Sequence, residues 1–163
     1  MATLLTLAGS GLLVPITVPL DPGELAQRAI YGCPEFVQWI AKDLPRLEAG
    51  RLRAADTPAE QLDNAMYRWI AGKHIQYDRM FKDLMPMRDE VWEMKTADIR
   101  VFGWVYRPCV FIAVFADYAD LYKGKTAKKS YESAKQRVIT ARSRLSLDEP
   151  KFTAGVFDDL VRV

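Results

Sequence analysis

The strongest constraint on the fold is a run of three β-type segments joined by very short connections. In "VWEMK", two large apolar side chains alternate with Glu93 and Lys95, which is the pattern of a strand with one buried face. "IRVFGWVY" follows the "TAD" turn, and "VFIAVFADY" follows "RPC" and is apolar on both parities, as a central strand requires. Because connections this short join antiparallel neighbours, residues 90–118 are predicted to form an antiparallel meander.

A basic amphipathic helix is predicted directly after the meander, over residues 126–146. Its apolar residues recur at intervals of three and four, so one face packs on the sheet; they are Tyr131, Ala134, Val138, Ala141 and Leu145. Residues 147–163 form a C-terminal extension that is expected to be a loop followed by a short closing element.

Helices are also predicted ahead of the meander, in a helical region that covers residues 21–85. "DPGE" and "TPAE" are helix-start signals, with a capping residue followed by proline and then glutamate. They predict one helix over residues 22–49 and a second over 58–84. The first is expected to be split at "YGCPE", where Gly32 and Pro34 end one helix and start the next.

The first 20 residues carry no charged side chain, and they are interrupted by glycine and proline. They lack the basic start and the unbroken apolar run of an export signal or a membrane span. We interpret "TLLTL" and "LLVPITVPL" as two short strands around the turn "AGSG", which form a strand pair or an N-terminal arm.

The predicted order is therefore strands, helices, a three-stranded meander and a basic helix, which is an α+β arrangement. The chain has 163 residues, of which 50% are hydrophobic and 27% charged. These values fit one domain over residues 1–163 with an ordinary core. Neither an internal repeat nor a linker is evident.

Charge is concentrated after the meander. The net charge is only +2, but residues 123–144 contain eight Lys or Arg and one Glu, a local +7 that leaves about −5 for the rest. Lys128 and Lys129 fall in the first turn of the predicted helix, where the helix dipole disfavours cations. A bound phosphate would resolve that conflict, and a solvated lysine-rich face is the alternative.

A second candidate surface lies on "IRVFGWVY". Arg100 shares its parity with Phe102, Trp104 and Tyr106, so one face of the strand carries a cation and three aromatic rings. Such a face could stack unpaired RNA bases while cations hold the phosphates. The alternative is that the rings form core beneath the helices, with Arg100 at the edge.

Several classes of site are disfavoured. Cys33 and Cys109 form no CxxC pair and His74 is the only histidine, so a zinc site is not expected. The chain has no Walker loop and no GxSxG elbow. We expect no metal, no cofactor and no membrane, and two cysteines in a chain of this size suggest a reducing cytoplasm.

"DEVWEMKTADIRVFGWVY", followed by "VFIAVFADYADLYKGKTAKKSYESAKQRV", resembles the RelE/ParE superfamily of toxin–antitoxin toxins. The nearest branch is the HigB-like, often phage-derived, group, and the resemblance covers residues 82–145. It implies a small α+β domain that cleaves mRNA, often on the ribosome, and that a cognate antitoxin neutralises. RNA can be cut by attack of its own 2′-hydroxyl on the neighbouring phosphate, which requires no metal.

The resemblance also implies site residues. Lys95 takes the place of the arginine in the family's "WELR", Arg100 matches its strand arginine, and the basic pair after the last strand is Lys123 and Lys125. Phosphate stabilisation is then expected from Arg100 and Lys123, and proton transfer from Lys125 or Lys95. The expected RNA-binding residues are Tyr106, Lys128, Lys129, Lys135 and Arg137.

Three functions are open on the sequence. The first is an RNA endonuclease toxin whose partners are RNA or the ribosome and an antitoxin. The second is a non-catalytic phage-encoded inhibitor or assembly protein that grips a protein partner through its N-terminal segment. The third is a gyrase-directed toxin of the ParE kind. A catalytic role predicts that Arg100, Lys123 and Lys125 converge on one concave, solvent-reachable spot.

Overall fold

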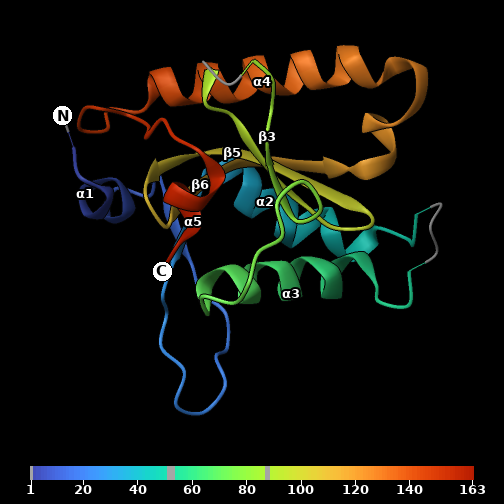
Figure 1. Cartoon of the computed structure of the whole chain (residues 1–163), viewed down its shortest axis with the longest axis horizontal. Helices are drawn as coiled ribbons and strands as arrows, with labels where there is room; N and C mark the ends of the chain where they lie inside the picture. The colour runs from blue at the N-terminus through green and yellow to red at the C-terminus, as the bar shows by residue number, and fades with distance from the viewer. Residues whose placement is uncertain (1, 51–53, 87–88) are drawn as a thin grey trace.

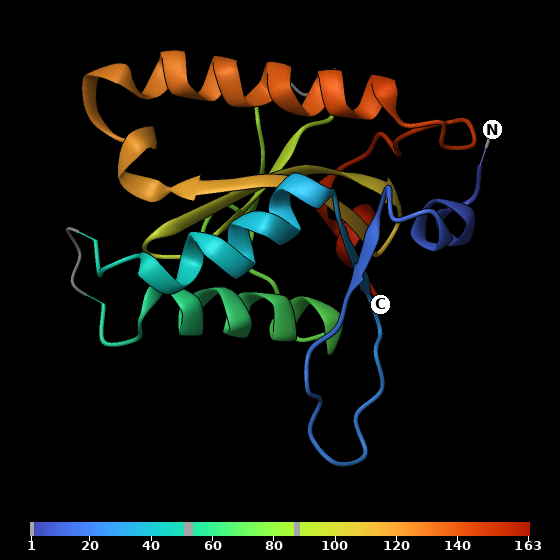
Figure 2. The ribbon, with the colours of Figure 1, turned by 180° about the vertical axis from the view of Figure 1, so that it is seen from behind.

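The computed structural model describes residues 2–50, 54–86 and 89–163, and it confirms the α+β class. A six-stranded sheet lies between α4 on one face and α2 with α3 on the other (Figures 1 and 2). Met1 and residues 51–53, which belong to the expected N-terminal arm and helical region, lie outside this description.

The sheet is mostly antiparallel. Its strands are β1 (Val14–Ile16), β2 (Ala29–Gly32), β3 (Phe81–Asp83), β4 (Trp92–Lys95), β5 (Ile99–Arg107) and β6 (Val110–Tyr118). Their spatial order is β1-β2-β6-β5-β4-β3, and only β2 and β6 run parallel. The predicted meander is confirmed as β4, β5 and β6.

The helices are α1 (Leu4–Gly9), α2 (Pro34–Lys42), α3 (Pro58–Ile70), α4 (Ala127–Arg144) and α5 (Phe157–Val161). Short 3₁₀ turns occur at η1 (Leu44–Arg46), η3 (Ala119–Tyr122) and η4 (Gly124–Thr126). In the ranges that the structure describes, no helix is both long enough and apolar enough to cross a membrane.

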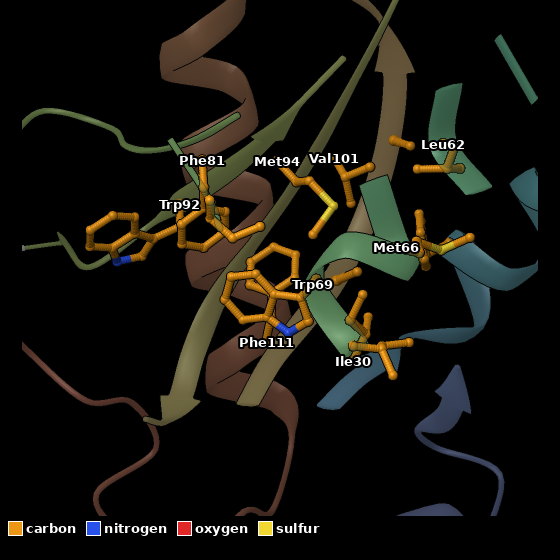
Figure 3. Close-up of a cluster of buried hydrophobic side chains, with 14 of the residues drawn as sticks. Ile30, Leu62, Met66, Trp69, Phe81, Trp92, Met94, Val101 and Phe111 are labelled. Carbon is orange, nitrogen blue, oxygen red and sulfur yellow. The ribbon is translucent and has the colours of Figure 1, made fainter. Parts of the chain in front are cut away.

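Each face of the sheet has its own core. On the α2–α3 side, Trp69 packs on Phe81 and Phe111 with ring centroids 4.8 and 5.8 Å apart, and Trp92 stacks on Phe81 at 5.1 Å (Figure 3). On the α4 side, Ala134 and Val138 are buried in the cluster that contains the β5 aromatics. Both faces of the central strands are therefore removed from water, which supplies most of the favourable free energy of folding.

The helix start at "TPAE" is confirmed. Thr57 and Glu60 form a reciprocal capping box, with each side chain bonded to the backbone N–H of the other residue. The sequence predicted a helix that reaches residue 84, but the observed helix ends at Ile70. Gly72 adopts a left-handed conformation (φ +72°) that stops it. Residues 81–83 are instead β3, which pairs with β4.

Two N-terminal expectations are wrong. "TLLTL" forms the N-cap and first residues of α1 and no strand, because Thr3 caps the helix by accepting a hydrogen bond from the Thr6 amide at 3.2 Å. The expected helix from residue 22 is absent: "DPGE" closes a turn in which the Glu24 amide donates to the Asp21 carbonyl at 3.0 Å. The chain then forms strand β2 and no helix, because pairing with β6 provides hydrogen-bond partners for its backbone N–H and C=O groups. The second strand and the helix start at Pro34 are confirmed.

The basic helix is confirmed as α4, with its predicted apolar face on the sheet. Thr126 occupies the position before the helix, but its side chain makes no capping hydrogen bond. The closing element of the C-terminal extension is α5.

Candidate functional site: a cleft between strand β4 and helix α4

A cleft of about 260 Å³ lies where the β3–β4 edge of the sheet passes under the N-terminal half of α4. Lys82 and Glu93 are opposite each other in the β3–β4 register, and Tyr131 and Lys135 share one side of α4 because they are four residues apart. The cleft is lined by Lys82, Asp83, Leu84, Met85, Glu93, Lys95, Tyr131, Glu132 and Lys135.

Glu93 is the buried acid of the cleft, with 1% of its surface exposed. The Tyr131 hydroxyl lies 3.3 Å from both of its carboxylate oxygens, and Arg100 Nε lies 3.8 Å from Oε2. Burial raises the pKa of Glu93, while the charges of Arg100 and Lys95 oppose the shift. A carboxylate with a raised pKa at the floor of a cleft is suited to accepting and returning a proton.

Two lysines beside Glu93 are held by Asp78. Lys95 donates to the Asp78 carbonyl at 2.6 Å, and Lys82 pairs with the Asp78 carboxylate at 2.8 Å. These contacts fix two ammonium groups at the β3–β4 side of the cleft. Burial raises the pKa of Tyr131, and the nearby charge of Glu93 adds to this, so the phenol keeps its proton near neutral pH.

The four expected catalytic residues have different surroundings. Lys95 and Arg100 are cross-strand partners beside Glu93, and the 9% exposed Arg100 donates to the carbonyls of Thr96 and Ile99. Lys123 instead pairs with Asp120 at 3.1 Å. Lys125 is exposed in η4. Lys95 therefore lines the cleft and Arg100 lies behind it beside Glu93, whereas Lys123 pairs with Asp120. The expected convergence of Arg100, Lys123 and Lys125 is not seen among the described residues that line this cleft.

The prediction that the aromatic residues of β5 form an RNA-binding surface is wrong. Phe102 and Trp104 are fully buried and Tyr106 is 6% exposed, because α4 and the C-terminal extension cover this face. Rings in this position form core and are not available to stack bases, which excludes the role expected for Tyr106. The alternative interpretation, core beneath the helices, is confirmed.

The basic residues of α4 divide between two sides of the helix. Lys135 is 5% exposed and lies 3.2 Å from Glu132 and 3.5 Å from Asp89, so its charge is already neutralised. Arg137 lies over the Phe115 ring and pairs with Glu35 of α2, away from the cleft. Lys128 and Lys129 are exposed on the first turn.

Sequence reasoning missed Glu93 and Tyr131 as site residues. Glu93 had been placed on the solvent face of a half-buried strand, and Tyr131 had been read only as part of the packing face of α4. Both statements follow from local periodicity, which does not reveal that α4 covers β4. The two residues together could have indicated the site. Glu93 lies on the face of β4 that α4 covers, and Tyr131 lies on the side of α4 that packs on the sheet.

Within residues 2–50, 54–86 and 89–163, no group of three or more His, Cys, Asp and Glu side chains is placed to hold a metal ion. Comparisons with protein-family models, curated proteins and solved structures find no match to this chain.

Proposed function

We propose that the chain is a toxin-type RNA endonuclease and that the cleft between β4 and α4 is its active site. The proposal combines the RelE/ParE-like pattern of the sequence with one observation: buried Glu93, with its raised pKa, is hydrogen-bonded to Tyr131 in a cleft bordered by lysines. Cleavage by the 2′-hydroxyl requires a proton acceptor, a proton donor and positive charge near the phosphate. The cleft contains all three.

In the proposed reaction, the 2′-oxygen attacks the adjacent phosphorus and the bond from phosphorus to the 5′-oxygen breaks. The 2′-hydroxyl proton passes to the Tyr131 oxygen while the Tyr131 proton passes to Glu93. Lys95 protonates the departing 5′-oxygen. The products are a 2′,3′-cyclic phosphate and a 5′-hydroxyl, and the ammonium groups of Lys82 and Lys128 stabilise the charged intermediate. The reaction uses no metal, and a cognate antitoxin would act by covering this cleft.

The first test is inducible expression in bacteria, with growth measured and RNA 5′ ends mapped for the parent and for Glu93→Gln. The parent should arrest growth and generate new 5′-hydroxyl ends. Because glutamine keeps the shape but cannot accept the proton, its cleavage rate should fall by roughly 100-fold or more. Normal growth with intact RNA from well-expressed parent protein would contradict the proposal.

A matched pair on α4 tests the location. Lys128 precedes Tyr131 by three residues and therefore lies on the cleft side of the helix, whereas Lys129 precedes Ser133 by four and lies toward the groove between α4 and α2. Lys128→Ala should reduce cleavage several-fold and Lys129→Ala should leave it near the parental rate. Equal losses would indicate that the whole basic helix binds RNA without a defined site.

A non-catalytic protein binder is the second candidate, and it is favoured by the connection between β1 and β2. The middle of this connection extends beyond the body of the protein in both views (Figures 1 and 2), and Leu25 on it is 74% exposed. An exposed apolar side chain on a projecting loop is suited to insertion into a partner. In the expression test, a binder leaves RNA intact in the parent and in Glu93→Gln alike.

A further inference from the structure

A second cavity, of about 380 Å³, lies on the opposite side of the sheet from α4, where α5 passes the ends of β3 and β4. Its floor consists of Trp92, 1% exposed, and Asp83, 4% exposed. Its rim consists of Tyr77, Val156, Phe157 and Asp158. The rim is open to solvent, because Tyr77 and Val156 are both well exposed.

Three aromatic rings line this cavity in fixed orientations. Tyr77 and Phe157 meet edge to face with centroids 5.4 Å apart. The indole of Trp92 is held by stacking on Phe81 with an interplanar angle of 10°. The Tyr77 hydroxyl donates to Asp83 Oδ1 at 2.7 Å, which fixes the ring relative to the acid on the floor. The rings are therefore organised before any ligand arrives.

The charges of the cavity complement its rings. Among the described residues that line it, the two charged ones are acids, Asp83 and Asp158. Aromatic faces attract cations through their quadrupole, and carboxylates add a direct attraction. An inorganic cation would have to lose its hydration shell against apolar walls that cannot replace it. A large, weakly hydrated cation does not face that cost.

We propose that this cavity binds an organic ammonium group carrying alkyl substituents, with the cation against the accessible parts of the Tyr77 and Phe157 rings, above the buried Trp92 and near the two carboxylates. The shared chemistry is the alkylated ammonium head. It can be supplied by a free small molecule or by a lysine-derived side chain of a partner, since the open rim accommodates a chain that continues into solvent. The site is separate from the cleft beside α4 and does not depend on the ribonuclease proposal.

The test follows the indole N–H resonance of Trp92 in isotope-labelled full-length protein, assigned with Trp92→Phe. Three probes are titrated: choline, its neutral analogue in which a tert-butyl group replaces the trimethylammonium group, and a short peptide with trimethyllysine. Saturable shifts with a cationic probe, and at least about tenfold weaker binding of the neutral analogue, are expected. Choline binding alone indicates a free small molecule, and peptide binding alone indicates a partner side chain.

Two neighbouring acids provide a matched control. Asp158 lines the cavity, whereas Asp159, which is also exposed, does not. Asp158→Asn should weaken binding roughly threefold to fivefold, as expected for one charge at a solvated rim, and Asp159→Asn should leave it unchanged. Phe157→Leu, with its fold checked by circular dichroism, should weaken binding about threefold to tenfold.

Three outcomes overturn the proposal. The first is the absence of a saturable shift of the Trp92 indole with any cationic probe in the millimolar range. The second is equal binding of choline and its neutral analogue, which would make the cavity a simple apolar pocket. The third is an equal effect of Asp158→Asn and Asp159→Asn, which would show that only long-range charge is sensed.

Discussion

Two tyrosine–carboxylate pairs have their carboxylates on the same β3–β4 ribbon and differ in their surroundings. Tyr131 and Glu93 are 3.3 Å apart in the cleft under α4, beside Arg100, Lys95 and Lys82. Tyr77 and Asp83 are 2.7 Å apart on the rim and floor of the aromatic cavity, although Asp83 also borders the cleft.

The surroundings of such a pair determine whether the carboxylate lies in a positively or a negatively charged environment. Around Glu93, cations offset part of the burial cost of the carboxylate and supply positive charge for a phosphate. Around Asp83, aromatic rings and a second acid favour a cation. One strand pair therefore has cations around its carboxylate on one side, and aromatic rings with a second acid around its carboxylate on the other.

The largest expected effect is on the aromatic side. Trp92→Ala removes a fully buried indole that stacks on Phe81, and it should lower the free energy of unfolding by about 3–5 kcal/mol. Tyr131→Phe, on the cleft side, is the comparison variant and should cost far less. Urea denaturation measures both, and a loss below about 1.5 kcal/mol for Trp92→Ala would mean that this wall repacks without a cavity.

Removal of the Tyr77 and Tyr131 hydroxyls should lower the free energy of unfolding by smaller and unequal amounts. Tyr77→Phe removes a short bond to a buried carboxylate and should cost about 1.5–2 kcal/mol, whereas Tyr131→Phe removes longer bonds and should cost about 0.5–1 kcal/mol. Denaturation midpoints of the two variants against the parent give the comparison. If Tyr131→Phe proves the more costly variant, the longer Tyr131–Glu93 bonds stabilise the fold more than the shorter Tyr77–Asp83 bond does, which would contradict this prediction.

The smallest expected effect is a change with pH in the stability difference between the parent and Glu93→Gln, which reports on Glu93 alone. Its pKa is raised from an ordinary value of 4.5, so the folded state holds this proton more tightly than the unfolded state. The stabilisation of the folded state by the protonated Glu93 is therefore fully present below pH 4.5, and it is lost as the pH rises through the higher pKa of the folded state. Glu93→Gln should become progressively more stable relative to the parent across that window.

The measurement is urea denaturation of both proteins at a series of pH values. Other shifted acids, such as Glu90, titrate in both proteins and cancel in the difference. A stability difference that does not change with pH would show that the Glu93 pKa is close to its unfolded value, and it would weaken the case for Glu93 as the proton acceptor.

Much of the fold was predictable because it depends on local pattern. The meander follows from period-two apolar residues with short turns, and the start of α3 follows from Thr57 and Glu60, which form their capping box within four residues. The α4 face follows from spacings of three and four. Strand β2 was missed because it is short and pairs with β6, which is distant in sequence, and β3 was missed because its three residues are too few to show a period.

The candidate site was predictable only in part. Lys95 and Arg100, two of the expected site residues, are cross-strand neighbours because their strands are consecutive. Glu93 was assigned to solvent because alternation describes the two faces of a strand but not what covers them. The aromatic cavity had no signal at all, because Tyr77, Trp92 and Phe157 come from three separate segments.

The sequence by itself determined the α+β class, the meander and the basic amphipathic helix, because hydrophobic period, turn residues and helix caps act over a few residues. Only the tertiary structure decided which polar groups left water. Placing α4 over β4 buried Glu93 beside Tyr131, and bringing α5 against the β3–β4 ribbon enclosed Asp83 among aromatic rings. Burial and long-range pairing depend on distant segments, and these set the pKa values and charge environments from which chemistry arises.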